Sequence, residues 1–150
     1  GPVPTMVRNQ TLPNATIRVD GGPAFPVQAL RPGILVLVPS GCDCPAAFNW
    51  LAGVAAKATA PAYVIYTSAT HAEVQQLYSQ LDIRLHGLVK LAKQTGKQTL
   101  ASHASFPAGI PADQLTAILV APDRVATWVS QLSPRDSQEP LVQVLTGITP

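Results

Sequence analysis

The chain has 150 residues, of which 47% are hydrophobic and only 12% are charged, about half the usual share of charged residues. Its formal net charge of +2 is not concentrated in any run of Lys or Arg, so nucleic acid is not an expected partner. The length suits one hydrophobic core, and no apolar stretch reaches the roughly 18 residues that cross a bilayer. A single domain is therefore predicted.

Residues 1–11 show no periodic apolar pattern and hold prolines at positions 2 and 4, which predicts a flexible arm. The opening Gly1-Pro2 has the form of a remnant left by a cleaved tag. We therefore expect a membrane anchor ahead of the arm in the full-length protein, and a folded domain over residues 12–150.

A short hairpin is predicted at the start of this domain. Ala15–Val19 has strand character, and the Asp-Gly-Gly sequence at positions 20–22 favours a tight turn. Ala24–Val27 can return as a second strand, although Pro26 interrupts it.

Two buried strands, each followed by a helix, are predicted next. Gly33–Val38 is a continuous run of β-branched residues and leucine, which is typical of a central strand buried on both faces. Apolar residues recur at helical spacing over Pro45–Lys57, where Pro45 fits the first turn of a helix. A second strand at Ala62–Thr67 and a second helix at His71–Leu81 follow from the same patterns.

The segment after residue 81 gives the weakest pattern. Leu85 and Leu88 fit helical spacing although Gly87 interrupts them, so a helix is predicted over residues 82–95. His86 is accordingly expected on a helix surface.

A second hairpin and a last helix are predicted near the C-terminus. Gln114–Val120 and Val125–Val129 have strand character and flank a turn that contains Pro122 and Asp123, and Gln138–Leu145 has helical spacing. The whole order predicts an α/β fold with a mixed sheet. Helices are expected on both faces, because right-handed crossovers place helices over parallel strands.

Two stretches carry a resemblance to a known group of proteins. LPNATIRVDGGPAFPVQALRPGILVLVPSGCDCP, residues 12–45, resembles the opening of a redoxin, in which a hairpin precedes a hydrophobic strand that ends at the active-site cysteine. LTAILVAPDRVATWV, residues 115–129, resembles the later redoxin hairpin. The chain is thus similar to the thioredoxin-like superfamily, specifically to redoxins that bacteria tether outside the cytoplasmic membrane. The resemblance implies a thioredoxin-like mixed sheet flanked by helices, with an N-terminal hairpin extension.

The chain departs from this family at two positions. The family carries Cys-x-x-Cys, whereas this chain has Cys42-Asp43-Cys44 with one spacer residue. The family also places a cis-proline just before the third strand of the sheet, and that position falls on about Leu115 here, with Pro111 slightly upstream.

The cysteine pair is the candidate catalytic site. Cys44 is expected to cap the predicted helix, where first-turn amides favour a thiolate, while Asp43 opposes that effect by its charge. A disulfide between Cys42 and Cys44 would close a small ring, and strain in such a ring raises the reduction potential. The pair is therefore predicted to accept electrons or to reshuffle disulfides rather than to act as an inert bridge.

The implied function is that of an extracytoplasmic thiol-disulfide oxidoreductase that uses Cys42 and Cys44, with no cofactor and no bound metal. Protein thiols or disulfides are the expected partners, and the protein is expected to be a monomer. Two alternatives stay open. One is a non-catalytic binding or scaffold domain on the same fold. The other is a Cu(I)-handling protein, because soft thiolates suit Cu(I). Copper-delivery relatives add a histidine, whose position falls near Asp113, while His103 could approach in space.

Trp50 and Trp128 are expected to be packing residues, and His71 is expected to start a helix. The sequence contains no P-loop, no Gly-x-Gly-x-x-Gly, no His-Glu-x-x-His and no Gly-x-Ser-x-Gly motif. Nucleotide-binding proteins, zinc proteases and serine hydrolases are therefore not indicated.

Overall fold

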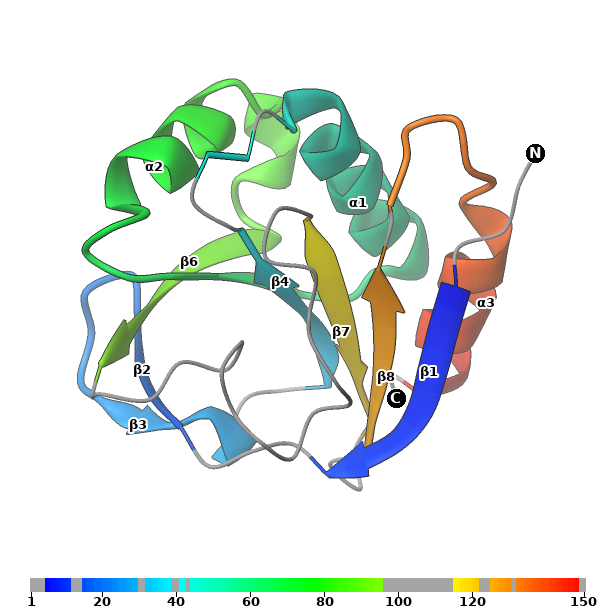
Figure 1. The fold of residues 1–150 in the computed structure, drawn as a ribbon, viewed down its shortest axis with the longest axis horizontal. Coiled ribbons are helices and arrows are strands. Elements are labelled where there is room, and N and C mark those ends of the chain that lie inside the picture. The colour runs from blue at the N-terminus through cyan, green and yellow to red at the C-terminus, as the bar shows by residue number, and fades with distance from the viewer. Residues whose placement is uncertain are drawn as a thin grey trace.

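The computed structural model describes residues 5–11, 15–29, 32–38, 41–42, 44–95, 115–121, 125–130 and 132–148. Its helices are α1 (Pro45–Ala58), α2 (His71–Ser79) and α3 (Glu139–Ile148), with short 3-10 turns at Val27–Ala29 and Ile83–Leu85. Its strands are β1 (Thr5–Thr11), β2 (Thr16–Val19), β3 (Phe25–Pro26), β4 (Gly33–Leu37), β5 (Ala62–Tyr66), β6 (Val89–Thr95), β7 (Thr116–Val120) and β8 (Val125–Ser130). These strands form one sheet, in the order β1-β8-β7-β4-β5-β6-β2-β3 (Figure 1).

The sheet is mixed, as predicted. Strands β4, β5 and β6 run parallel, and the neighbours on either side are antiparallel. Helix α1 connects β4 to β5 and helix α2 connects β5 to β6. The two strand–helix units predicted from the apolar runs are therefore both present, and so is the C-terminal hairpin followed by a helix.

Strand β4 lies at the centre of the sheet and is buried along its whole length. Ile34 and Val36 belong to a core cluster shared with the helices, while Leu35 and Leu37 belong to a second cluster on the opposite face. The alternation explains the unbroken apolar run in the sequence, because both faces of this strand exclude water. Gly33 begins the strand where an added Cβ would collide with the Pro61 carbonyl oxygen.

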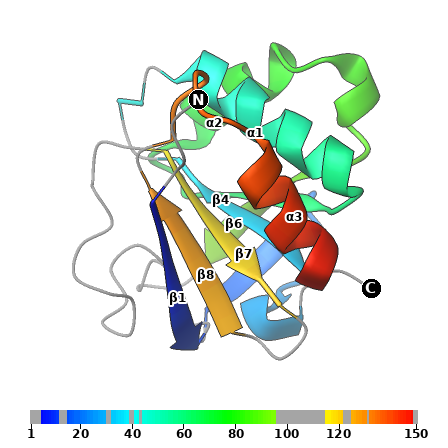
Figure 2. The same cartoon turned by 90° about the vertical axis from the view of Figure 1, so that its right-hand side faces the viewer.

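The described helices all pack on one face of the sheet (Figure 2). Phe48 and Leu51 of α1, Leu77 of α2 and Leu141 of α3 share one core cluster. The cluster on the other face contains Ile17 and Val27 with residues of the central strands, and none of its members comes from α1, α2 or α3. Helices on both faces were predicted, and among the described residues they occupy one. Residues 96–114 lie outside the described residues.

The helix predicted over residues 82–95 is wrong. A 3-10 turn covers Ile83–Leu85, and Val89–Thr95 forms strand β6, which pairs with β5 and β2. His86 consequently lies in a turn and not on a helix surface. The leucine spacing matched a helix. However, residues 89–95 lie between β5 and β2 and form backbone hydrogen bonds to both strands, and this tertiary pairing decides the conformation.

The flexible arm predicted over residues 1–11 is corrected for Thr5–Thr11. These residues form β1, which pairs antiparallel with β8 across a register shift between Val7 and Gln10. Such pairing needs only an extended backbone that meets the unpaired N–H and C=O groups of an edge strand. It does not require alternating apolar residues, so the sequence shows no periodic pattern here. The extent of the domain, residues 12–150, stays a prediction.

The predicted N-terminal hairpin is present in β2 and β3. Its turn places Asp20 at φ 51° and Gly21 at φ 75°, and the Gly22 N–H donates to the Val19 carbonyl over 2.9 Å. A turn with two successive residues at positive φ is the type that an Asp-Gly sequence favours. No helix in the described ranges combines the length and apolar character that a bilayer crossing requires.

Candidate active site

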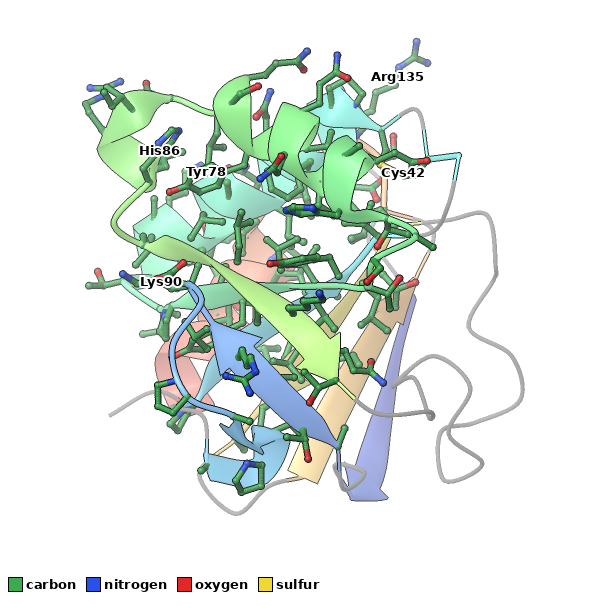
Figure 3. The ribbon with its side chains drawn as sticks, turned by 90° about the vertical axis from the view of Figure 1, so that its left-hand side faces the viewer. Cys42, Tyr78, His86, Lys90 and Arg135 are labelled. Carbon is green, nitrogen blue, oxygen red and sulfur yellow. A yellow bond between two sulfur atoms is a disulfide. The ribbon has the colours of Figure 1, made fainter. Side chains whose placement is uncertain are left out.

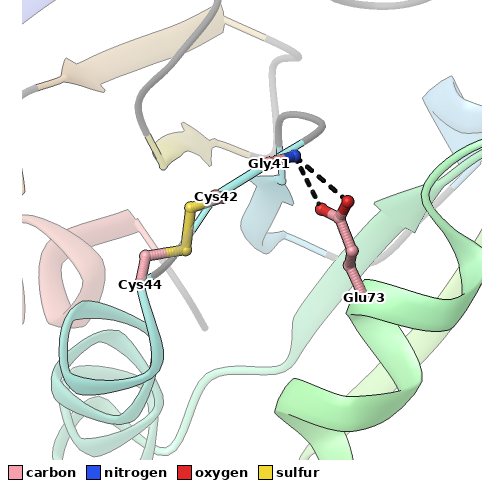
Figure 4. Close-up of a disulfide and its surroundings, with 4 residues drawn as sticks. All are labelled: Gly41, Cys42, Cys44 and Glu73. Carbon is pink, nitrogen blue, oxygen red and sulfur yellow. Dashed lines mark hydrogen bonds between the residues drawn. A yellow bond between two sulfur atoms is a disulfide. The ribbon is translucent and has the colours of Figure 1, made fainter.

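The candidate site is a disulfide between Cys42 and Cys44, in the connection from β4 to α1 (Figure 4). The two α-carbons are 5.3 Å apart, within the range that disulfides span. Both residues are half-buried and both contact the helix-side core. The structure therefore brings together the two residues that the sequence singled out. Asp43, between them, lies outside the described residues.

Helix α1 begins at the disulfide. Cys44 is its N-cap, and the Cys44 carbonyl accepts from the Phe48 N–H over 2.9 Å. Pro45 is the first helical residue and has no N–H, so the free first-turn amides are those of Ala46 and Ala47. The predicted helix start at Pro45 is confirmed. The amides and the positive end of the helix dipole favour negative charge at this place.

Glu73, in the first turn of α2, holds the loop that carries Cys42. The Gly41 N–H donates to both carboxylate oxygens of Glu73, over 3.1 Å to Oε1 and 3.0 Å to Oε2 (Figure 4). Gly41 has φ 77°, a left-handed conformation that glycine adopts without strain. Glu73 was not predicted from the sequence, since a contact across 32 residues leaves no local signal.

A cleft of about 170 Å³ opens beside the disulfide. It is lined by Cys42, Pro45, Glu73, Gln76, Leu77 and Gln80. The cleft thus lies between the start of α1 and one side of α2, and Cys42 is the cysteine that borders it. A molecule in the cleft would therefore lie beside Cys42, while Cys44 caps the helix.

The aromatic and histidine side chains have other roles. Trp50 is buried, as predicted, and its indole N–H donates to the Asp136 carbonyl over 2.9 Å. His71 starts α2, as predicted, and stacks on Tyr66 with ring centroids 5.0 Å apart. His86 packs against Tyr78, toward the other end of the helix layer from Cys42 (Figure 3).

Several residues named from the sequence lie outside the described residues. They are His103, Pro111 and Asp113, whereas Trp128 lies in strand β8. Leu115 is buried directly before β7, at about the position where the redoxin family has its cis-proline. Within the described ranges, no three His, Cys, Asp or Glu side chains gather closely enough to hold a metal ion.

Comparisons with known proteins agree with this architecture. No protein-family model matches the chain, and no curated protein is significantly similar to it in sequence. A thio-disulfide isomerase from Thermus thermophilus matches in structure with a TM-score of 0.66 at 20% identity, over 93% of this chain and 94% of that one. The fold is thioredoxin-like. The resemblance drawn from residues 12–45 and 115–129 is confirmed at the level of the fold.

Two further solved structures share this thioredoxin-like fold. BsSco, a member of the Sco family of cytochrome c oxidase assembly proteins in which a disulfide switch was identified, matches with a TM-score of 0.63 at 12% identity, over 93% of this chain and 94% of that one. A secreted disulfide oxidoreductase of Mycobacterium tuberculosis, homologous to E. coli DsbE, matches with a TM-score of 0.58 at 20% identity, over 94% of this chain and 95% of that one. At these identities, the likeness concerns the fold.

Proposed function

We propose that this protein is an extracytoplasmic thiol-disulfide oxidoreductase whose Cys42–Cys44 disulfide accepts electrons from protein thiols. One observation carries the proposal: the disulfide lies at the N-terminus of α1, and Cys42 borders an open cleft. A helix N-terminus stabilises a thiolate, which makes the cysteine there a good leaving group. An inert structural bridge needs neither feature.

The exchange runs in two steps. A substrate thiolate attacks Sγ of Cys42 from the cleft, the Cys42–Cys44 bond breaks, and its electron pair goes to Sγ of Cys44. The first-turn amides of Ala46 and Ala47 are placed to stabilise the Cys44 thiolate. A second substrate thiolate then attacks the mixed disulfide and displaces Cys42. Two substrate thiols are oxidised to a disulfide, and the protein disulfide is reduced to a dithiol.

The state of the cysteines bears on the cellular location of the protein. The closed disulfide and the likeness to a secreted oxidoreductase support an extracytoplasmic location, because cytosolic thiols are kept reduced. Attachment to a membrane, the monomeric state and the identity of the partner thiols stay predictions.

The deciding measurement is a redox titration against glutathione with thiol trapping, combined with insulin reduction, which runs the same exchange in the reverse direction from the Cys42/Cys44 dithiol. The wild-type disulfide is expected to open at millimolar glutathione. Cys42→Ser should lose insulin reduction, whereas Cys44→Ser should accumulate a mixed disulfide on Cys42, because the resolving thiol is gone. A wild-type disulfide that resists glutathione, with insulin reduction independent of Cys42, would instead favour a binding or scaffold domain.

A second candidate, Cu(I) handling, is supported by the likeness to BsSco and by the sulfur donors of Cys42 and Cys44 after reduction. Competition with a Cu(I) chelator tests it on the reduced protein. Binding should collapse in Cys42→Ser if the sulfurs hold copper, and should weaken in His103→Ala if that histidine contributes. Unchanged binding in the cysteine variants removes this candidate.

A further inference from the structure

We propose that the cleft beside Cys42 selects thiol substrates that carry a basic side chain next to their reactive cysteine, and that Glu73 attracts that side chain. This inference rests on the proposed thiol-disulfide exchange and adds the chemistry of the preferred substrate. It starts from the lining of the cleft, where Glu73 supplies the only ionised side chain among the six residues that form it.

The charge of Glu73 is not neutralised by a basic side chain in the part of the chain that the structure describes. The one salt bridge there joins Arg84 to Asp82. The Gly41 N–H donates to both Glu73 oxygens, but a backbone amide carries no net charge, and a carboxylate has about four acceptor sites. Glu73 therefore keeps both its negative charge and acceptor capacity for a cation.

The bond to Gly41 also fixes where that charge lies. Glu73 is half-buried and is tied to the residue directly before Cys42 (Figure 4), so its carboxylate is held at the same cleft that Cys42 borders. A positioned charge loses less conformational freedom on binding than a freely moving one. An Arg or Lys in the substrate would add charge-assisted hydrogen bonds without disturbing the loop.

The size of the cleft limits what enters it. Its volume of about 170 Å³ is the space for a side chain and not for a folded domain. When a substrate cysteine approaches Sγ of Cys42, the residue beside that cysteine is the one that can reach the cleft. The remaining walls are neutral, with the apolar Pro45 and Leu77 and the amides of Gln76 and Gln80. The stem of a Lys or Arg side chain can pack on such walls while its head meets Glu73.

The experiment compares two short peptides that differ only in the residue after their single cysteine, Arg in one and Glu in the other. Each peptide reduces the oxidised protein, and thiol trapping gives the rate constants. The same peptides react with a neutral small disulfide, which divides out differences in the peptides' own thiol reactivity. We expect wild type to favour the Arg peptide by about fivefold after this correction, and less at high salt.

Three variants test the assignment. Glu73→Gln keeps an acceptor for the Gly41 N–H and should bring the corrected ratio close to one. Gln76→Lys places a positive charge in the cleft and should reverse the preference. Glu139→Gln, on α3, removes the same charge away from the cleft and should leave the ratio unchanged.

The outcomes separate this inference from the proposed function. Exchange at Cys42 with equal rates for both peptides, or an unchanged ratio in Glu73→Gln, overturns the role of Glu73 while the oxidoreductase stands. A wild-type disulfide that reacts with neither peptide overturns both. Far-UV circular dichroism reports on folding, because the spectrum of Glu73→Gln should match that of wild type.

Discussion

Helix α1 has two regions that are built differently. Its start carries the disulfide, where Cys42 and Cys44 are half-buried and Gly41 is held by Glu73. Its body is buried against the sheet and α3 along one side, through Phe48, Trp50, Leu51, Val54 and other apolar residues. The two regions therefore have different roles: the buried body anchors the helix, while the half-buried start leaves Cys42 at the edge of a cleft.

The junction between α1 and α3 strengthens the body further. The Gln138 side-chain amide donates to the Trp50 carbonyl over 2.9 Å, and the Lys57 ammonium donates to the Gln138 side-chain oxygen. Gly53 faces Gln138 closely, and a Cβ there would approach its Nε2 to 3.0 Å. Polar contacts thus join two helices that are far apart in the sequence, and none of these residues lines the cleft beside Cys42.

The largest expected effect is a loss of stability in the buried body of α1. Leu51 is 1% exposed, so Leu51→Ala removes buried methyl groups and leaves a cavity. The free energy of unfolding should fall by about 3 kcal/mol, measured by urea denaturation of the oxidised protein. The rate of exchange at Cys42, measured well below the unfolding midpoint, should stay close to that of wild type.

A control separates stability from chemistry in this comparison. Ala46→Gly, at an exposed position in the first turn, should change the free energy of unfolding by much less than Leu51→Ala. If Leu51→Ala slowed exchange as strongly as it lowered stability, the start and the body of α1 would be coupled and would not have separate roles.

A smaller effect is expected at the α1–α3 junction. Gln138→Met keeps the approximate length of the side chain and removes both of its hydrogen bonds. The free energy of unfolding should fall by about 1 kcal/mol, the usual net value of such bonds. Exchange at Cys42 should be unaffected. A loss no greater than the experimental error would show that water replaces the Gln138 side chain at the Trp50 carbonyl and the Lys57 ammonium.

The same contrast explains what could be predicted from the sequence. The unbroken apolar run of β4 and the helical spacing after Pro45 are local patterns, so the strand, the helix and the cysteines at their junction were predictable. β6 was not, because residues 89–95 are selected as a strand by their neighbours β5 and β2 and not by their own pattern. Glu73 was missed for a similar reason, since its bond to Gly41 forms only once α2 lies beside the cysteine loop.

The smallest expected effect lies in the turn after α2, where the helix predicted over 82–95 gives way to a 3-10 turn. The Asp82 carboxylate accepts from the Arg84 side chain and from the Arg84 N–H, and these bonds lower the pKa of Asp82 from 3.8 to about 2. Since the folded pKa is depressed, the contribution to stability is present above the unfolded value and is lost as the pH falls from about 4 to about 2.

An NMR titration of the side-chain carboxyl carbons tests this turn directly. The Asp82 signal should titrate near pH 2 in wild type, and Arg84→Gln should raise its midpoint toward 3.8, because the guanidinium bonds are the largest cause of the shift. Both side chains are exposed, so solvent screens the pair and little change in overall stability should accompany the titration. Exchange at Cys42 should be the same in Arg84→Gln as in wild type, since neither residue lines the cleft. An Asp82 midpoint near 3.8 in wild type would mean that the pair does not persist in solution, and the turn would then be held by its backbone bonds, such as the one from the Leu85 N–H to the Asp82 carbonyl.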